Sequence, residues 1–265
     1  MTQELPFFVR DGDRYLPTAA SRGFWSPQSL NGRVIVGLLG YELERLYGEP
    51  GWQPARLTVD MFRLPDHSPV EFVTRVIRDG RRLRLMEADF ISGGVPMGRA
   101  SCQFLKRTDP PPGEFWRPEP WDAPPPLSVP LPEDAERRAW DLRPFNSRLD
   151  TIGPRRAWLR ELRELVGGVP LTPFTRVAVA ADLASPFANR GSQGVGYINS
   201  DVTVYLHRLP ATEWIGFELA NHQATEGVAT GTCWLHDEQG PIGSASVAAV
   251  AQTRRADAGP ANAPV

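Results

Sequence analysis

The chain has 265 residues, of which 41% are hydrophobic and 23% charged, and its formal net charge is −2. This composition predicts a soluble globular protein with a sizeable core, built as one large domain or two small ones. The balanced charge predicts no basic face, which excludes nucleic acid as an expected partner. The N-terminus lacks the apolar run of a signal peptide, and no stretch has the roughly 18–20 apolar residues of a membrane helix.

The cysteines and histidines argue against a metal centre. Cys102 and Cys233 lie far apart in the chain, and the four histidines are scattered. This spacing forms neither a disulfide framework nor a metal site. We therefore expect a reduced, cytoplasmic protein without a cofactor.

The first predicted element is a helix over Leu30–Tyr47, which is apolar on nearly every side. Such a helix is usually buried. Four strands rich in β-branched and aromatic residues are predicted after it, with turn signals at Asp79-Gly80 and Gly93-Gly94. The four strands are Arg56–Leu64, Val70–Arg78, Arg82–Ile91 and Pro96–Lys106.

A proline-rich segment divides the chain. Thr108–Pro132 holds two runs of three prolines, a density that favours an extended linker. Trp116 and Trp121 predict that this linker packs against the protein surface. We expect a first module over residues 1–107, a linker over 108–135, a second module over 136–254 and a disordered tail over 255–265.

The second half repeats the first pattern. Trp140–Leu149 and Arg155–Leu162 are expected as strands, although the sequence RRAWLRELREL would equally suit a short helix. A helix is predicted over Thr172–Leu183, with Thr172 as its N-cap, a proline in its first turn and Pro186 as its stop. Four more strands follow at Tyr197–Arg208, Glu213–His222, Val228–His236 and Ile242–Thr253.

Short motifs recur between the halves at one spacing. Residues 63–65 (Arg-Leu-Pro) recur at 208–210, and Gly98, Ala100 and Ser101 recur as Gly243, Ala245 and Ser246, always 145 positions later. A single register across these matches indicates an internal repeat. A buried helix wrapped by a long antiparallel sheet, present twice, predicts an α+β double hotdog.

Several motifs, taken in order, resemble a known family. They are L-N-G-R-V at 30–34, F-R-L-P at 62–65, V-x-R-D-G at 76–80, A-A-D-L at 180–183 and D-V-T-V-Y-L-H-R at 201–208. This order, from about Phe7 to Arg254, resembles the double-hotdog acyl-CoA thioesterases of the TesB-like, thioesterase-like superfamily. The strand from Asp201 to Arg208 is the most specific part of the resemblance.

The resemblance implies hydrolysis of fatty acyl-CoA by a water molecule, without a covalent nucleophile. The family's aspartate at the end of the second helix matches Asp182, and its Thr/Ser/Asn position matches Asn199. The family's glutamine on the last strand falls on Ala248, which is a departure. Gln252 lies four residues further along, roughly 13 Å on a strand, and does not obviously replace it.

The residues themselves also single out Asp182. It lies in an apolar run near a helix C-terminus, where the helix dipole disfavours negative charge. A buried carboxylate has a raised pKa, which suits a base that acts on water. The alternative is an ordinary helix-end aspartate that faces solvent. Asn199 can donate and accept hydrogen bonds, although it would also suit a turn.

Two further pairs are candidate substrate-binding residues. Asn31 and Gly32 begin the first helix, where free amides could bind the thioester oxygen, or they form a plain N-cap and tight turn. Asn189 and Arg190 lie in a loop that could meet the phosphates of CoA.

Two functions therefore remain open. One is a cytoplasmic acyl-CoA thioesterase, with acyl-CoA as its partner and possible assembly into a dimer or tetramer. The other is an acyl or acyl-CoA binding protein of the same fold, degenerate at Ala248. A hotdog dehydratase ranks last, because neither helix start has a histidine.

Overall fold

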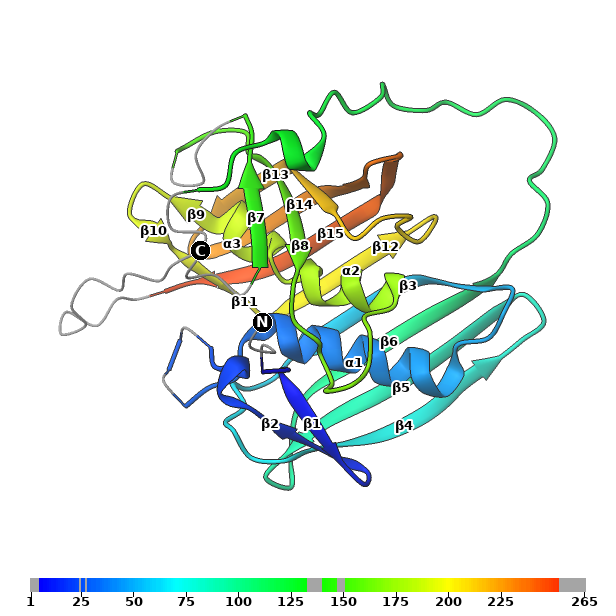
Figure 1. The fold of residues 1–265 in the computed structure, drawn as a ribbon, viewed down its shortest axis with the longest axis vertical. Coiled ribbons are helices and arrows are strands. Elements are labelled where there is room, and N and C mark those ends of the chain that lie inside the picture. The colour runs from blue at the N-terminus through cyan, green and yellow to red at the C-terminus, as the bar shows by residue number, and fades with distance from the viewer. Residues whose placement is uncertain (1–4, 24, 27, 133–139, 147–150, 253–265) are drawn as a thin grey trace.

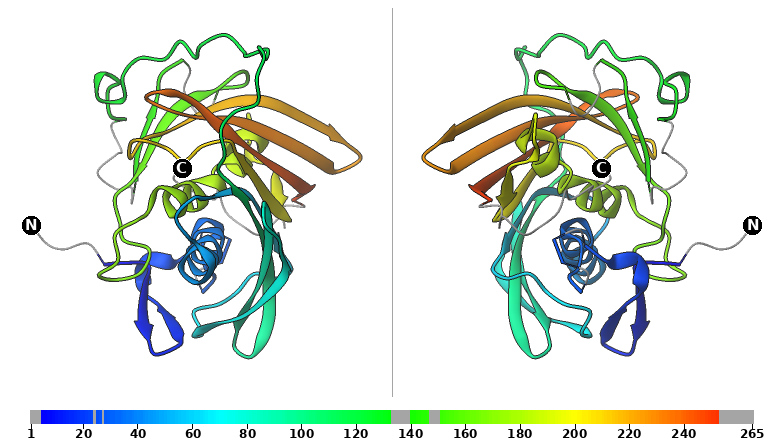
Figure 2. Two further views of the ribbon diagram at one scale, coloured as in Figure 1. Left: turned by 90° about the vertical axis from the view of Figure 1, so that its right-hand side faces the viewer. Right: turned by 90° about the vertical axis from the view of Figure 1, so that its left-hand side faces the viewer.

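The computed structural model describes residues 5–23, 25–26, 28–132, 140–146 and 151–252 (Figure 1). The expected tail over 255–265 lies outside the described residues. One large antiparallel sheet curves around two central helices (Figure 2). No helix in the described ranges is long and apolar enough to cross a membrane.

Helices are few and strands many. The helices are α1 (Gly32–Tyr47), α2 (Pro173–Ala181) and α3 (Ala184–Asn189), with 3-10 turns η1 (Ala19–Ser21) and η2 (Pro126–Ser128). The strands of the first half are β1 (Phe8–Asp11), β2 (Arg14–Pro17), β3 (Trp52–Met61), β4 (Val70–Asp79), β5 (Leu83–Ser92) and β6 (Val95–Lys106). Those of the second half are β7 (Trp140–Pro144), β8 (Arg156–Glu161), β9 (Arg190–Gly191), β10 (Gly194–Val195), β11 (Tyr197–Asn199), β12 (Asp201–Leu206), β13 (Ile215–Thr225), β14 (Val228–Asp237) and β15 (Gly240–Ala251).

The sheet has an internal two-fold relation that follows the sequence repeat. Its strand order is β1-β2-β4-β5-β6-β3-β12-β15-β14-β13-β8-β7, with β11 also paired to β15. At its centre β3 pairs with β12, and Thr203 donates a hydrogen bond of 3.2 Å to Thr58, 145 positions earlier. The pairing of Thr58 with Ser101 recurs as that of Thr203 with Ser246. The structure confirms the predicted α+β double hotdog.

The helices α1 and α2 pack closely against each other. A Cβ atom on Gly37 would lie 2.4 Å from Val179, and one on Gly40 would lie 2.7 Å from Ala178. Because Gly32 contacts Asp182 while Glu44 contacts Thr172, the helices run antiparallel. Each helix therefore ends beside the first turn of the other.

Two predicted elements differ from the observed ones, and at a third the structure decides between a strand and a helix. Pro186 does not stop α2, because that helix already ends at Ala181. Pro186 lies in the first turn of α3. The amides of a first turn have no acceptor within the helix, so the missing amide of proline costs no hydrogen bond there. The strand predicted over Tyr197–Arg208 is interrupted at Ser200. Arg156–Glu161 is a strand, so the helical alternative is wrong.

The linker crosses the outside of the molecule as a long loop (Figure 1). Trp121 stacks on His236 with ring centroids 4.0 Å apart and contacts Trp158. Trp116 is 87% exposed, so the prediction that it packs down is wrong. Trp121, in the later part of the linker, packs against Phe145, Trp158 and His236.

Candidate functional site

The carboxyl group of Asp182 lies at the first turn of α1. Asp182 is the C-cap residue of α2, and a Cβ atom on Gly32 would lie 2.5 Å from its Oδ2 atom. The dipole of α2 disfavours a charge here, but the positive N-terminal end of α1 favours it. The negative charge of Asp182 is thus disfavoured by the helix that carries it and favoured by the antiparallel helix packed against it.

Asn31 is the N-cap of α1. Its side chain accepts a hydrogen bond of 3.1 Å from the amide of Arg33. The first amides of a helix have no acceptor within it, so the amide of Gly32 is a hydrogen-bond donor directed away from the helix. The structure confirms Asn31 as the N-cap of the helix. The turn that it caps lies against Asp182.

Asn199 reaches Asp182 from the sheet. Its Nδ2 atom donates to Oδ1 of Asp182 at 3.1 Å and to the carbonyl of Asp201 at 3.3 Å. With both amide hydrogens directed to these acceptors, its Oδ1 atom can accept a hydrogen bond from a water molecule. The structure therefore brings Asp182, Asn199 and the start of α1 into one cluster.

Burial raises the pKa of the Asp182 carboxyl above its usual range. The hydrogen bond from Asn199 and the positive charge of Arg33 oppose this rise. Asp182 is therefore a stronger base than an exposed aspartate, while Asn199 and Arg33 still help to keep it ionised.

Arg33 was not among the residues that the sequence singled out. It forms a buried ion pair with Glu161 of β8, with 2.6 Å between Nη1 and Oε2, and its guanidinium lies over the rings of Phe7 and Trp140. The signal was an arginine directly before the apolar run Val34–Tyr41 of a helix predicted to be buried. Its partner could not be predicted, because Glu161 lies 128 positions away in the other module.

The residue of β15 that pairs with Asn199 is Ala249, one position after the residue that the sequence assigned to the family's glutamine. Ala248 pairs with Thr230 on the face of β15 that carries Ser246, whereas Ala249 pairs with Asn199 and is 2% exposed. Because side chains alternate between faces, a side chain at 249 would lie on the side of Asn199 and one at 248 on the opposite side. Both residues are alanine, so the glutamine is missing in either register.

Asp201 lies on that opposite face. Its Oδ1 atom accepts a hydrogen bond of 2.7 Å from the amide of Ala248, and burial raises its pKa. It supports the strand break at Ser200, whose amide donates to the carbonyl of Ala248. These hydrogen bonds give Asp201 a structural role in the sheet.

Asn189 and Arg190 lie at the end of α3. Asn189 is 3% exposed, and neither polar atom of its side chain has a hydrogen-bond partner among the described residues. The carbonyl of Arg190 accepts a hydrogen bond from Arg155. A buried asparagine suits a surface contact with CoA phosphates poorly, and that contact stays a prediction for both residues.

Taken together, the fold and this cluster define a class of protein: a fused double hotdog with a carboxylate of one helix set against the first turn of the other. Residues 21–105 match the N-terminal domain of an acyl-CoA thioesterase family, and residues 110–250 match its C-terminal domain. The chain belongs to this acyl-CoA thioesterase family.

Solved structures share the fold at low sequence identity. The TesB protein of Mycobacterium avium subspecies paratuberculosis is 18% identical with a TM-score of 0.69, over 93% of this chain and 96% of that one. A hot dog fold protein from Alicyclobacillus acidocaldarius is 15% identical with a TM-score of 0.71 (94% and 96% covered). The acyl-CoA thioesterase II of Mycobacterium marinum is 16% identical with a TM-score of 0.63 (93% and 96% covered). No curated protein sequence matches this chain.

Proposed function

We propose that this protein hydrolyses acyl-CoA to a free acid and CoA, with Asp182 as the base that activates water. The observation that carries the proposal is the position of the Asp182 carboxylate, which is desolvated, hydrogen-bonded to Asn199 and set against the start of α1. The family match supports the reaction class. A cytoplasmic location and assembly into a dimer or tetramer stay predictions.

The proposed mechanism uses three groups. A water molecule donates to Asp182 and to Oδ1 of Asn199, which orient its oxygen toward the thioester carbon. Asp182 takes a proton as the water oxygen bonds to that carbon, and the amide of Gly32 stabilises the resulting oxyanion. The C–S bond then breaks, and the proton passes from Asp182 to the CoA thiolate.

A second candidate is binding of acyl-CoA without turnover. The alanines at 248 and 249 favour it, because a side-chain amide on this strand would add a further hydrogen bond to the water. The cluster of Asp182 and Asn199 favours hydrolysis over this alternative.

Release of CoA separates the two candidates. We expect the protein to release free CoA thiol from at least one member of a panel of short- to long-chain acyl-CoAs, measured with a thiol-reactive dye. A folded protein that binds an acyl-CoA and releases no thiol from any member would support the binding function and contradict hydrolysis.

Replacement of Asn199 by alanine should change the pH dependence of hydrolysis. The hydrogen bond from Asn199 lowers the pKa of Asp182, so its removal raises that pKa. The base must be ionised to act, so we expect the acid limb of the kcat/KM profile to move to higher pH. A limb that stays in place or moves to lower pH would show that Asp182 is not the titrating base.

A further inference from the structure

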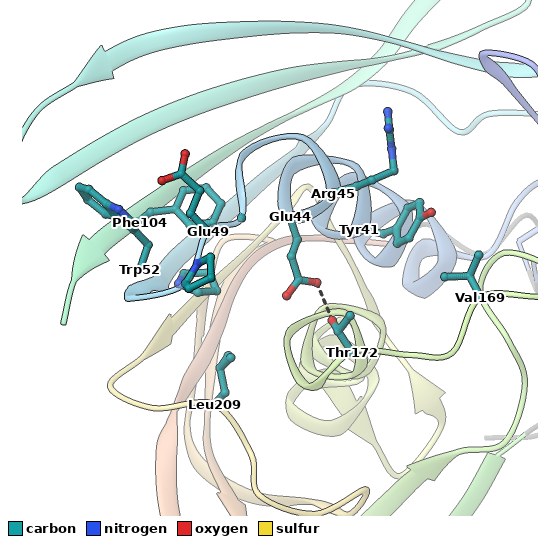
Figure 3. Close-up of a pocket in the computed structure, with 12 residues that line it drawn as sticks. Tyr41, Glu44, Arg45, Glu49, Trp52, Phe104, Val169, Thr172 and Leu209 are labelled. Carbon is teal, nitrogen blue, oxygen red and sulfur yellow. Dashed lines mark hydrogen bonds between the residues drawn. The ribbon is translucent and has the colours of Figure 1, made fainter.

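A second carboxylate lies at the opposite end of the helix pair. Glu44, near the C-terminal end of α1, accepts a hydrogen bond at Oε2 from the hydroxyl group of Thr172, the N-cap of α2 (Figure 3). The same atom accepts a second hydrogen bond from the hydroxyl group of Thr175 in the first turn of α2. Asp182 stands in the same relation to the first turn of α1. The two-fold relation of the fold thus places one carboxylate at each end of the helix pair.

Glu44 lines a pocket of about 470 Å³. In the close-up its side chain lies between Trp52 and Phe104 on one side and Tyr41 and Val169 on the other (Figure 3). Ligand pockets of a few hundred Å³ that are mostly apolar, with one or two placed polar groups, are typical of small-molecule sites. Burial also raises the pKa of Glu44, although both hydroxyl groups oppose the rise.

Polar side chains such as Tyr41 and Thr172 line this second site, but it lacks counterparts of the groups proposed to position water and the oxyanion beside Asp182. The positions 145 residues before Asn199 and Ala249 hold Pro54 and Phe104, and both line the pocket. Neither side chain can hold a water molecule by a hydrogen bond. Pro173, at the first position of α2, has no amide to offer an oxyanion, unlike Gly32 of α1. The geometry therefore suits binding rather than hydrolysis.

A basic pocket adjoins the apolar one. It has a volume of about 370 Å³, shares Glu49 and Trp52 with the first pocket and includes Arg81, Arg84 and Lys106. The guanidinium of Arg84 lies 4.2 Å from the centre of the Trp52 ring, and the ammonium of Lys106 lies 5.4 Å from it. The carboxylates of Glu49 and Asp79, which also line this pocket, pair with Arg84. Three cations against two carboxylates leave an excess of positive charge.

We propose that these adjoining pockets form a second acyl-CoA site, which holds the acyl group beside Glu44 without hydrolysing it. An apolar pocket suits an acyl chain, and the neighbouring cations suit the phosphates of CoA. The carboxylate of Glu44 would repel a free fatty acid but tolerates the uncharged thioester. The choice of acyl-CoA rests on the proposed function, whereas the presence of a second site does not.

The test counts bound ligand molecules. The probe is a medium-chain S-(2-oxoalkyl)-CoA, in which a methylene group between sulfur and carbonyl prevents hydrolysis, titrated calorimetrically into the full chain. We expect two molecules per chain for the wild-type protein and one for Leu209→Trp, which fills the apolar pocket. Leu209→Ile should still bind two. Lys106→Gln should weaken the second site several-fold and leave the first unchanged.

The outcomes separate this proposal from the proposed function. Leu209→Trp should release CoA from acyl-CoA at the wild-type rate, which also shows that it is folded. One equivalent or none bound by the wild-type protein, or two equivalents still bound by a folded Leu209→Trp, would overturn the second site whatever the hydrolysis assay gives. Equal binding of the free fatty acid would overturn the assignment to a thioester. Two equivalents bound without any CoA release would contradict only the proposed hydrolysis.

Discussion

Asp182→Asn is expected to lower kcat for acyl-CoA hydrolysis by about 10²–10⁴-fold, the usual contribution of a general base. The amide has nearly the shape of the carboxylate but cannot take a proton from water. The fold should be retained, because the space between Gly32 and Asn199 stays filled. Steady-state release of CoA thiol, with circular dichroism as a check of folding, measures the effect.

Asp201→Asn is the matched control. Asp201 is a second carboxyl with a pKa raised by burial, only two residues from Asn199, but its side chain bonds to the amide of Ala248 on the other face of the sheet. An asparagine there can still accept that hydrogen bond, so we expect a change of no more than a few-fold. Full activity in Asp182→Asn, or a larger loss in Asp201→Asn, would contradict the proposed mechanism.

Arg33→Met is expected to lower the free energy of unfolding by about 3–5 kcal/mol, the usual effect of leaving one partner of a buried ion pair alone. Glu161 is 6% exposed, and Arg33 compensates its charge across the two modules. Urea denaturation followed by fluorescence measures the change. The additional change Glu161→Gln should restore part of the loss, because the amide carries no charge and its oxygen can still accept from the amides of Leu162 and Arg163.

This destabilisation should depend on pH. Burial raises the pKa of Glu161, and Arg33 opposes the rise, so the pKa is higher still in Arg33→Met. Below the pKa of the unfolded chain Glu161 is protonated in both states, and the loss should be small. It should grow as pH rises toward and through the folded-state pKa, since the unfolded chain then loses its proton first. A loss that is equal at acid and neutral pH would show that the buried charge is not its cause.

The sequence alone was enough to predict the fold. The repeat at 145 positions and the alternation of apolar residues along the strands are local patterns, and both recur in the pairing of β3 with β6 and of β12 with β15. The cap at Asn31 also follows from local chemistry, because an N-cap side chain bonds to its own first turn. The prediction that Pro186 ends a helix was wrong for a local reason. Pro186 lies in the first turn of α3, and a helix tolerates proline there.

The candidate site could be predicted only in part. The apolar run around Asp182 marked that residue, but the neighbour that favours its charge, the first turn of α1, lies in the other module. Which residue of β15 lies beside Asn199 depends on the strand break at Ser200, which shifts the pairing by one residue relative to a continuous strand.

Local patterns therefore determined the strands, the helices and their repetition in this protein, because hydrogen bonding and side-chain alternation act over a few residues. Only the tertiary structure decided which groups meet. The antiparallel packing of α1 on α2 sets Asp182 against Gly32, Glu44 against Thr172, and Arg33 against Glu161 of the neighbouring strand. Each of these contacts joins residues more than a hundred positions apart, which no local pattern specifies.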